Sequence, residues 1–112
     1  IMTMLTFKTS KPHQSGIVIT NKNGVLKYFF EKISKPPGKI ANGAIYLLSP
    51  QILKLIKKKF SRSKDFSNEI IQKFIGKIYC YNTKNFFLDI GDLKSYEQVN
   101  EFVSKKSNIL TR

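Results

Sequence analysis

The chain has 112 residues, which is enough for one domain with one hydrophobic core and too few for two. Its hydrophobic fraction is 41% with 12% aromatic residues, as in ordinary globular proteins. No segment approaches the roughly 18 consecutive apolar residues that a membrane-spanning helix needs, and the N-terminal residues lack a secretory signal pattern. These features exclude a membrane-spanning protein and predict one soluble, cytoplasmic domain.

The formal net charge of +13 invites comparison with nucleic-acid-binding proteins, because clustered cations neutralise phosphates. Of the 20 basic residues, however, only Arg62 and Arg112 are arginine, the residue preferred for bidentate recognition of phosphates and bases. The lysines are spread along the chain, and the densest run, 57–59, ends a predicted helix, where cations suit the helix dipole. A basic nucleic-acid-binding domain is therefore only a second alternative.

The single cysteine and the single histidine are not expected to carry chemistry. Cys80 has no partner for an internal disulfide and lies in an apolar-rich run, which predicts a core or half-buried thiol. His13 has no accompanying His or Cys cluster, so we interpret it as a solvated loop residue. Nothing in the cysteine content indicates an oxidising compartment.

The first apolar segment, residues 2–7, has no hairpin partner beside it in the sequence. A strand with a free edge presents unpaired backbone groups to other chains. We therefore expect this segment to form a sheet edge that docks on another chain or on a second copy, and we predict a homo-oligomer.

Residues 16–20 and 25–30 are β-branched and aromatic runs separated by Asn21-Lys22-Asn23-Gly24. Asn-Gly between two such runs is a strong hairpin signal, so the two strands should pair antiparallel. The second strand delivers Glu31 and Lys32 at its end, before a loop whose prolines cannot continue a sheet.

Residues 41–48 form a nearly continuous apolar run, the pattern of a strand that is covered on both faces. Ser49 and Pro50 then supply an N-cap and a first-turn proline, which predicts a helix from about Pro50 to Lys59. The inward residues of this helix, by helical spacing, are Ile52, Leu53, Ile56 and Phe60. A strand that leads directly into a helix implies an α/β arrangement of layers.

A second short helix is predicted over residues 67–74, and another strand over residues 76–81. We assign Ser67 and Glu69 mainly to capping this helix, with ligand contact as the minor alternative. The inward residues of the helix are expected to be Ile70, Ile71 and Phe74.

The last predicted elements are a turn over residues 82–85, a short strand over 86–88 and a C-terminal helix. Asp92 or Ser95 can cap this helix, which should run to about Lys105. Its predicted apolar face carries Tyr96, Val99, Phe102 and Val103.

Polar or charged residues lie at the starts or ends of three apolar runs. Taken singly, Glu31 and Lys32 fit a solvated strand end, Asn42 and Gly43 fit a simple bend, and Asp89 fits the cap of a turn. Their joint occurrence favours one site, built from several strand ends, for a phosphorylated, hydroxyl-rich ligand and a metal ion.

Short motifs that include these residues occur in a characteristic order along residues 4–103. They are Met4-Leu5-Thr6-Phe7, Gly16-Ile17-Val18, Phe30-Glu31-Lys32, Pro36-Pro37-Gly38, Asn42-Gly43-Ala44-Ile45-Tyr46, Asp65-Phe66-Ser67-Asn68-Glu69 and Asp89-Ile90-Gly91. Together they closely resemble the C-terminal half of the sugar-phosphate nucleotidyltransferases, also called nucleotide-sugar pyrophosphorylases. The mannose- and heptose-1-phosphate guanylyltransferases are the branch that the chain resembles most.

The resemblance implies an α/β fold, with a partial mixed β-sheet, flanking helices and the C-terminal half of a Rossmann-like nucleotidyltransferase fold. Residues 1–106 would be the sugar-phosphate-binding part, and residues 107–112 a frayed tail. The implied enzyme couples a nucleoside triphosphate to a sugar 1-phosphate, releases pyrophosphate and yields a nucleotide sugar for surface polysaccharide. A GDP-mannose or GDP-heptose type of product is favoured.

The resemblance also implies roles for the candidate site residues. Glu31 would accept hydrogen bonds from sugar hydroxyls, and Lys32 would neutralise the sugar phosphate. Asn42, with the backbone of Gly43, would hold the sugar. Asp89 would be one of two carboxylates on Mg²⁺, the cofactor, while the sugar 1-phosphate and the nucleoside triphosphate would be the small-molecule partners.

One departure from the family limits what this chain should do alone. The glycine-rich loop that cradles the triphosphate is absent, since the chain has 6 glycines and none are close together. We therefore expect the chain to be inactive without a missing N-terminal half. A non-catalytic sugar-phosphate-binding or regulatory module is the first alternative function.

Three smaller departures concern the site itself. Ile33 stands where many members have proline, and Asn42-Gly43-Ala44 replaces the common Asn-Ala-Gly. Asp92 follows the Asp-Ile-Gly turn where threonine is common. We favour helix capping for Asp92 over crowding of the metal site.

Overall fold

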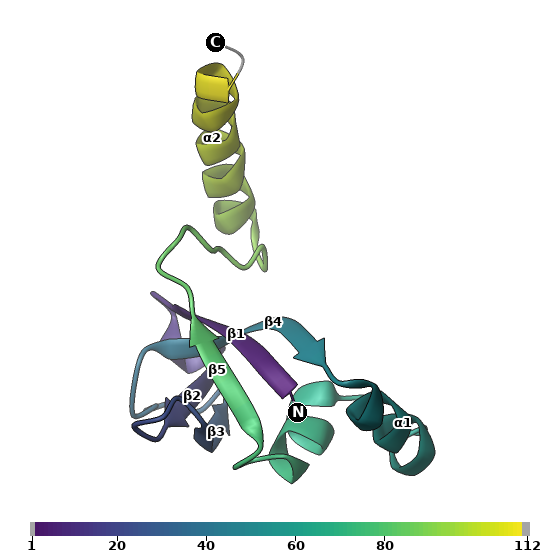
Figure 1. The fold of residues 1–112 in the computed structure, drawn as a ribbon. Helices are drawn as coiled ribbons and strands as arrows, with labels where there is room; N and C mark the ends of the chain where they lie inside the picture. Colours follow the sequence, from purple (N-terminus) through teal and green to yellow (C-terminus); the bar gives the residue numbers. More distant parts are fainter. Residues whose placement is uncertain (1, 111–112) are drawn as a thin grey trace.

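The computed structural model describes residues 2–110, and its side chains to residue 106. It contains a mixed five-stranded sheet in the order β3-β2-β4-β1-β5, with helices beside it (Figure 1). In chain order the elements are β1 (Met2–Lys8), the 3-10 turn η1 (Pro12–Gln14), β2 (Gly16–Thr20), β3 (Leu26–Glu31), β4 (Ile40–Leu48), α1 (Pro50–Lys59), the short π-helix η2 (Phe66–Ile71), β5 (Ile78–Asn82) and α2 (Leu93–Leu110). The predicted α/β class with a mixed sheet and flanking helices is confirmed.

Strand β1 lies inside the sheet and is not an edge. It pairs antiparallel with β4 and parallel with β5, and its Met2 and Met4 side chains are 2% and 0% exposed. The prediction that residues 2–7 form a docking edge is therefore wrong, because strands distant in sequence supply both neighbours. The homo-oligomer stays a prediction, without this edge as its basis.

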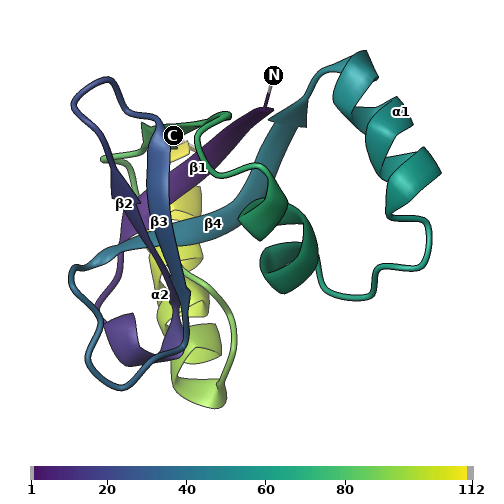
Figure 2. The same cartoon turned by 90° about the horizontal axis from the view of Figure 1, so that it is seen from below.

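The hairpin predicted from Asn-Gly is confirmed. Strand β2 pairs antiparallel with β3, and Gly24 takes the positive φ of 82° that the turn needs. The turn also reaches β5 at the other margin of the sheet, since the Cys80 amide donates to the Gly24 carbonyl at 2.8 Å. The strongly twisted sheet thus curls until its two margins meet near the hairpin turn (Figure 2).

Helix α1 and the η2 segment cover one face of the sheet and form the core with it. The predicted cap is confirmed, since Ser49 Oγ accepts from the Ile52 amide at 3.3 Å. Ile52 is buried, but Leu53 is 52% exposed and Leu55 packs on the core instead. The helix is therefore rotated slightly from the predicted inward face.

The η2 segment places the predicted residues inward, with Ile70, Ile71 and Phe74 all buried. Its cap differs from the prediction, because Asp65 rather than Ser67 accepts from the Asn68 amide. The capping role of Glu69 is confirmed, since its carboxylate accepts from the amides of residues 64 and 65.

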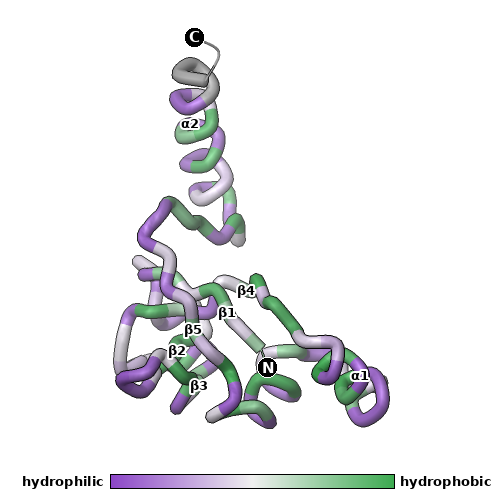
Figure 3. Tube along the Cα trace, in the orientation of Figure 1, coloured by the Kyte–Doolittle hydropathy of each residue, from purple (hydrophilic) through white to green (hydrophobic). Residues whose placement is uncertain are grey.

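The other face of the sheet is open. Thr3 on β1 pairs with Leu47 on β4 and with Tyr79 on β5, so these three side chains form one row. Leu47 is 73% exposed, and Ile45 and Tyr81 on the same face are more than half exposed. The prediction that residues 41–48 are covered on both faces is wrong within this chain, although Figure 3 shows the second half of β4 to be hydrophobic. We call this surface the open face.

The C-terminal helix stands away from the sheet (Figure 1). Residues 86–88 are irregular and do not form the predicted strand. The predicted apolar face of α2 is largely uncovered, since Tyr96 and Val103 are exposed, whereas Phe102 stacks on Phe86 with ring centroids 3.9 Å apart. The helix continues to Leu110, beyond the predicted end, and the last two residues of the predicted frayed tail lie outside the described residues.

In the described part of the chain, no helix is long and apolar enough to cross a membrane.

The contrast between Ile52 and Leu53 yields a stability prediction. Ile52→Ala should lower the free energy of unfolding by about 2–5 kcal/mol, because it removes buried methyl groups and leaves a cavity. Leu53→Ala, the matched control on the same turn, should change it by less than about 0.5 kcal/mol. Urea unfolding followed by circular dichroism measures both. Equal losses would show that α1 buries the face predicted from sequence.

Candidate functional site

The strand register gathers the candidate residues of three strands at one end of the sheet. Glu31 pairs with Gly16, and the β2–β4 pair of Ile17 with Ala41 places Gly16 next to Asn42. Asn42 in turn pairs with Thr6 on β1. Glu31 and Asn42 therefore lie in the same row, on the sheet face that η2 covers.

Gly16 leaves room for the Glu31 carboxylate. A Cβ atom at position 16 would lie 2.7 Å from the ring of Phe29 and 3.1 Å from Oε2 of Glu31. The Glu31 side chain is half-buried beside this glycine. The sequence motif that begins at Gly16 thus has a local role in the site, which is to admit the carboxylate.

Lys32 follows in a strained backbone conformation. Its φ is 50°, in the left-handed region that costs a non-glycine residue about 1 kcal/mol or more, and its amide donates to the Ser15 carbonyl at 3.1 Å. Its ammonium group is exposed and lies near Asp65. The pKa of Asp65 is lowered mainly by hydrogen bonds from Asn68, and the Lys32 charge contributes a smaller part.

Residues 42–44 form a bulge in β4, where the pairing register with β1 shifts. Asn42 Oδ1 accepts from the Ala44 amide at 2.8 Å, and Ala44 takes a φ of 58°. A Cβ atom at Gly43 would lie 3.0 Å from the Leu5 carbonyl oxygen and 3.1 Å from the ring of Phe87. The Asn-Gly-Ala order therefore places glycine at the close contact and leaves alanine with the left-handed backbone.

Tyr46 contacts Asn42 and was not predicted as a site residue. Its hydroxyl accepts from Asn42 Nδ2 at 2.7 Å, and its ring packs on Phe66 with centroids 4.5 Å apart. Burial raises the pKa of Tyr46, the Asn42 hydrogen bond opposes this, and the Glu31 charge adds to it. The available sequence signal was its place in the Asn42 motif.

Asp89 lies in the irregular segment that follows β5. Phe87, two residues earlier, packs on Phe7 with ring centroids 4.4 Å apart and lies against Gly43. The segment thus passes over the bulge on the open face, whereas Glu31 and Asn42 lie on the opposite face at the same end of the sheet. Asp89 is exposed and makes no hydrogen bond or ion pair within residues 2–106.

The carboxylates of the described residues fit only part of a metal site. Across this part of the chain, no three His, Cys, Asp or Glu side chains are grouped closely enough to hold a metal ion. Mg²⁺ is usually held by one or two carboxylates together with substrate phosphates and water. An exposed, unengaged Asp89 fits one such ligand.

Asp92 acts as the helix cap that we favoured from the sequence. Its Oδ1 accepts from the Ser95 amide at 2.7 Å, and its Oδ2 accepts from Lys11 Nζ at the same distance. The hydrogen bond from Lys11 and, next, that from Ser95 hold the pKa of Asp92 well below its usual range. This pair ties the start of α2 to the loop before β2.

A family model described as nucleotidyl transferase matches residues 1–106. The chain belongs to this family. The resemblance seen in the sequence motifs is thereby confirmed, and the matched relatives carry the names of sugar-1-phosphate nucleotidyltransferases.

Two curated relatives illustrate the match. The glucose-1-phosphate adenylyltransferase of Fervidobacterium nodosum is 29% identical over 97 residues, which cover 81% of this chain and 23% of the relative. The catalytic subunit beta of mannose-1-phosphate guanylyltransferase from Drosophila melanogaster is 30% identical over 95 residues, which cover 84% of this chain and 25% of the relative. The chain thus spans about a quarter of the length of these relatives. They differ in the nucleotide that they are named for, so the favoured guanylyl branch is not confirmed.

The fold is shared with a solved structure, a putative glucose-1-phosphate thymidylyltransferase from Bacillus anthracis in complex with a sucrose. The TM-score is 0.70 at 17% identity, over 90% of this chain and 42% of that one. The predicted part of a Rossmann-like nucleotidyltransferase fold is therefore confirmed.

The two causes that lower the pKa of Asp92 can be separated by experiment. In Lys11→Ala the pKa should rise but stay below its ordinary value, because the Ser95 amide still donates. A carboxylate whose pKa is lowered by folding stabilises the folded chain at neutral pH, and this contribution is lost as the pH falls through the lowered value. Carbon-detected NMR titration measures the midpoint.

Lys105→Ala is the matched control for this titration, because Lys105 pairs only with Glu101 at 3.9 Å on the surface of α2. It should leave the Asp92 midpoint unchanged. An unchanged midpoint in Lys11→Ala as well would contradict the assigned cause.

Proposed function

We propose that this chain is the sugar-phosphate-binding part of a sugar-1-phosphate nucleotidyltransferase. The complete enzyme couples a nucleoside triphosphate to a sugar 1-phosphate, releases pyrophosphate and yields a nucleotide sugar. The observation that carries the proposal is the register of the sheet in a member of this family, which puts Glu31 and Asn42 in one row next to Lys32.

The chemistry of these side chains suits a phosphorylated carbohydrate. The half-buried Glu31 carboxylate accepts hydrogen bonds from sugar hydroxyls, and Asn42 can both accept and donate. The exposed Lys32 ammonium offsets the charge of the sugar phosphate. Since phosphoryl-group transfer depends mainly on positioning and charge neutralisation, these contacts are what this part of an enzyme must supply.

Mg²⁺ is the proposed cofactor, with Asp89 as one ligand. When bound, the ion would neutralise phosphate charge and orient the reacting groups. The remaining ligands would come from the substrates and from a complementary segment.

That complementary segment is part of the proposal. The chain lacks a glycine-rich phosphate loop, and its open face exposes Ile45 and Leu47 on β4 and Tyr81 on β5. Contiguous exposed apolar surface marks a site of further packing. We propose that a segment bearing the nucleotide loop packs on this face, either in the same polypeptide or as a separate chain.

The finer assignments are proposals as well. We favour a guanylyltransferase that acts on a mannose- or heptose-type 1-phosphate, since Asp89-Ile90-Gly91 followed by Tyr96 is closer to that branch. Comparison of turnover with GTP, ATP and dTTP tests this choice. We also propose a cytoplasmic enzyme that serves surface polysaccharide synthesis and assembles as a homo-oligomer, which sedimentation of the complete enzyme tests.

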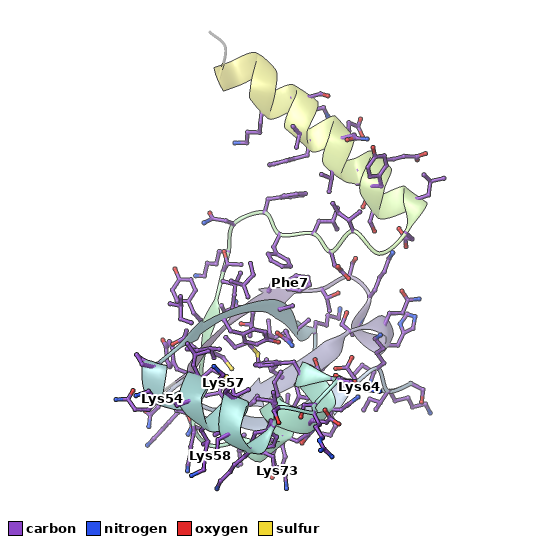
Figure 4. All side chains as sticks on the ribbon, turned by 90° about the vertical axis from the view of Figure 1, so that its right-hand side faces the viewer. Phe7, Lys54, Lys57, Lys58, Lys64 and Lys73 are labelled. Carbon is purple, nitrogen blue, oxygen red and sulfur yellow. The ribbon has the colours of Figure 1, made fainter. Side chains whose placement is uncertain are left out.

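Two alternatives predict different results. A non-catalytic sugar-phosphate-binding module, favoured by the absent glycine-rich loop, would bind a sugar 1-phosphate without any turnover. A nucleic-acid-binding domain is suggested by exposed lysines on and near α1, such as Lys54, Lys57 and Lys58 (Figure 4). It would show affinity for nucleic acid that falls steeply with salt in a gel-shift titration.

The site assignment predicts the behaviour of a chimera in which the family-matched residues 1–106 replace the corresponding segment of a relative, the glucose-1-phosphate adenylyltransferase of Halalkalibacterium halodurans, which is 33% identical over 92 residues. Glu31→Gln should raise the KM for sugar 1-phosphate about tenfold or more, since a charged hydrogen bond is lost. Asp89→Asn should lower kcat about 100-fold, since a metal ligand is lost. Pyrophosphate release measures both.

Glu97→Gln on the exposed surface of α2 is the control and should leave both constants unchanged. Turnover that survives Glu31→Gln and Asp89→Asn together would contradict the site, and a chimera without any turnover would contradict the proposed function.

The open face gives a second prediction. Leu47→Asp should destabilise the chimera by at least about 2 kcal/mol, because it buries a charge against the complementary segment, but should scarcely change the isolated chain. Leu53→Asp, on the exposed side of α1, should be tolerated in both. Thermal unfolding of both variants, each made in the isolated chain and in the chimera, measures these effects. Equal effects of Leu47→Asp in chain and chimera would show that nothing packs on this face.

A further inference from the structure

Tyr46 lies on β4, the strand that also carries Asn42 of the proposed sugar site. It lies on the covered face in the same row as Met4, and its ring packs against Phe66 and the core. Its hydroxyl is directed toward Asn42 rather than into the core, and it is the only tyrosine hydroxyl in the described part of the chain with a side-chain hydrogen bond. Because the ring is packed against Phe66 and the core, the position of the hydroxyl oxygen is fixed as well.

The hydrogen bonds of Asn42 define how its amide is oriented. The Ala44 amide can only donate, so the atom that receives it at 2.8 Å must be the Asn42 oxygen. The Asn42 nitrogen therefore faces the Tyr46 hydroxyl, at 2.7 Å. Both ends of the amide are held, and one donor hydrogen and one acceptor lone pair remain for a ligand.

The negative charge of Glu31 is close enough to raise the pKa of the Tyr46 hydroxyl. Because its oxygen accepts from Asn42, its own hydrogen is left to donate, and Glu31 is the carboxylate whose charge acts on this hydroxyl. The hydrogen bond from Asn42 thus ties the bulge of β4 to the ring that is anchored in the core.

We propose that Tyr46 is a positioning residue, which holds the Asn42 amide in the orientation that recognises the hydroxyl groups of a sugar 1-phosphate. This inference rests on the proposed function for its ligand, but the link from Tyr46 to Asn42 can be tested without any ligand.

The first experiment uses the chain itself. Tyr46→Phe keeps the ring contact with Phe66 and removes only the hydroxyl. The side-chain amide resonances of Asn42 in the ¹⁵N–¹H spectrum should shift, and their exchange with water should become faster by about tenfold. Tyr28→Phe is the matched control, since Tyr28 is 51% exposed on β3 and outside the site. Asn42 resonances that are unchanged in Tyr46→Phe would overturn the link, whatever the function.

The second experiment uses the chimera defined above. Tyr46→Phe should raise the KM for sugar 1-phosphate about tenfold, with less than a twofold change in kcat and in the KM for the nucleoside triphosphate. A merely structural role would lower the apparent kcat through loss of folded protein and leave the KM unchanged, and the melting temperature reports that loss.

A panel of monodeoxy sugar 1-phosphates sharpens the second experiment. For the analogue that lacks the recognised hydroxyl, wild-type and Tyr46→Phe chimeras should have the same KM. A penalty of equal size for every analogue would overturn the positioning role. If Glu31→Gln raises the KM and Tyr46→Phe does not, the inference fails and the proposed function stands. If neither variant has any effect, the proposed sugar site itself fails.

Discussion

The pairing of β1 with two strands that are distant in sequence is the constraint on which the structure depends. Thr6, only 1% exposed, anchors this pairing, since its hydroxyl contacts Asn82 Oδ1 at 3.1 Å and its carbonyl accepts from the Thr83 amide at 2.9 Å. A slip of one residue would send every side chain of the strand to the opposite face. The same slip would separate Thr6 from Asn42, with which it pairs beside the bulge of β4.

Backbone strain is concentrated beside the two residues proposed to bind the sugar. Among residues 2–110, Lys32 and Ala44 are the two non-glycine residues with positive φ. Lys32 directly follows Glu31, and Ala44 comes shortly after Asn42. Such conformations cost about 1–2 kcal/mol each and persist only where the surroundings impose them. Here the Ser15 carbonyl holds the Lys32 amide, and Asn42 holds that of Ala44. The strain therefore accompanies a fixed geometry at the strand ends.

Local sequence signals predicted the local structure well. The Asn-Gly turn gave the hairpin, and Ser49 with Pro50 gave the start of α1, because these features depend only on neighbouring residues. The position of β1 could not be predicted in the same way, since its partners are strands β4 and β5. The strand expected at residues 86–88 is absent because an aromatic run packs equally well as an irregular segment, here with Phe87 on Phe7.

The candidate site, too, was predicted only in part from the sequence. Glu31, Lys32, Asn42, Gly43 and Asp89 were chosen because polar residues at the mouths of apolar runs are unusual, and the first four lie together at one end of the sheet. Their roles stay predictions. Tyr46 was overlooked because an aromatic residue inside an apolar strand is ordinary core, and only the register reveals that its hydroxyl meets Asn42.

Two incomplete features of the chain have the same location. The open face leaves apolar side chains of β4 and β5 without a covering layer, and the segment that carries Asp89 crosses that same face beside Phe7. A layer of polypeptide packed there would bury the apolar side chains and could bring further metal ligands to Asp89. Two independent partners would each have to recognise a smaller surface. One complementary segment that carries the nucleotide loop accounts for both with a single interface, and it would bring the triphosphate to the end of the sheet that carries Glu31 and Asn42, where the sugar phosphate can reach it.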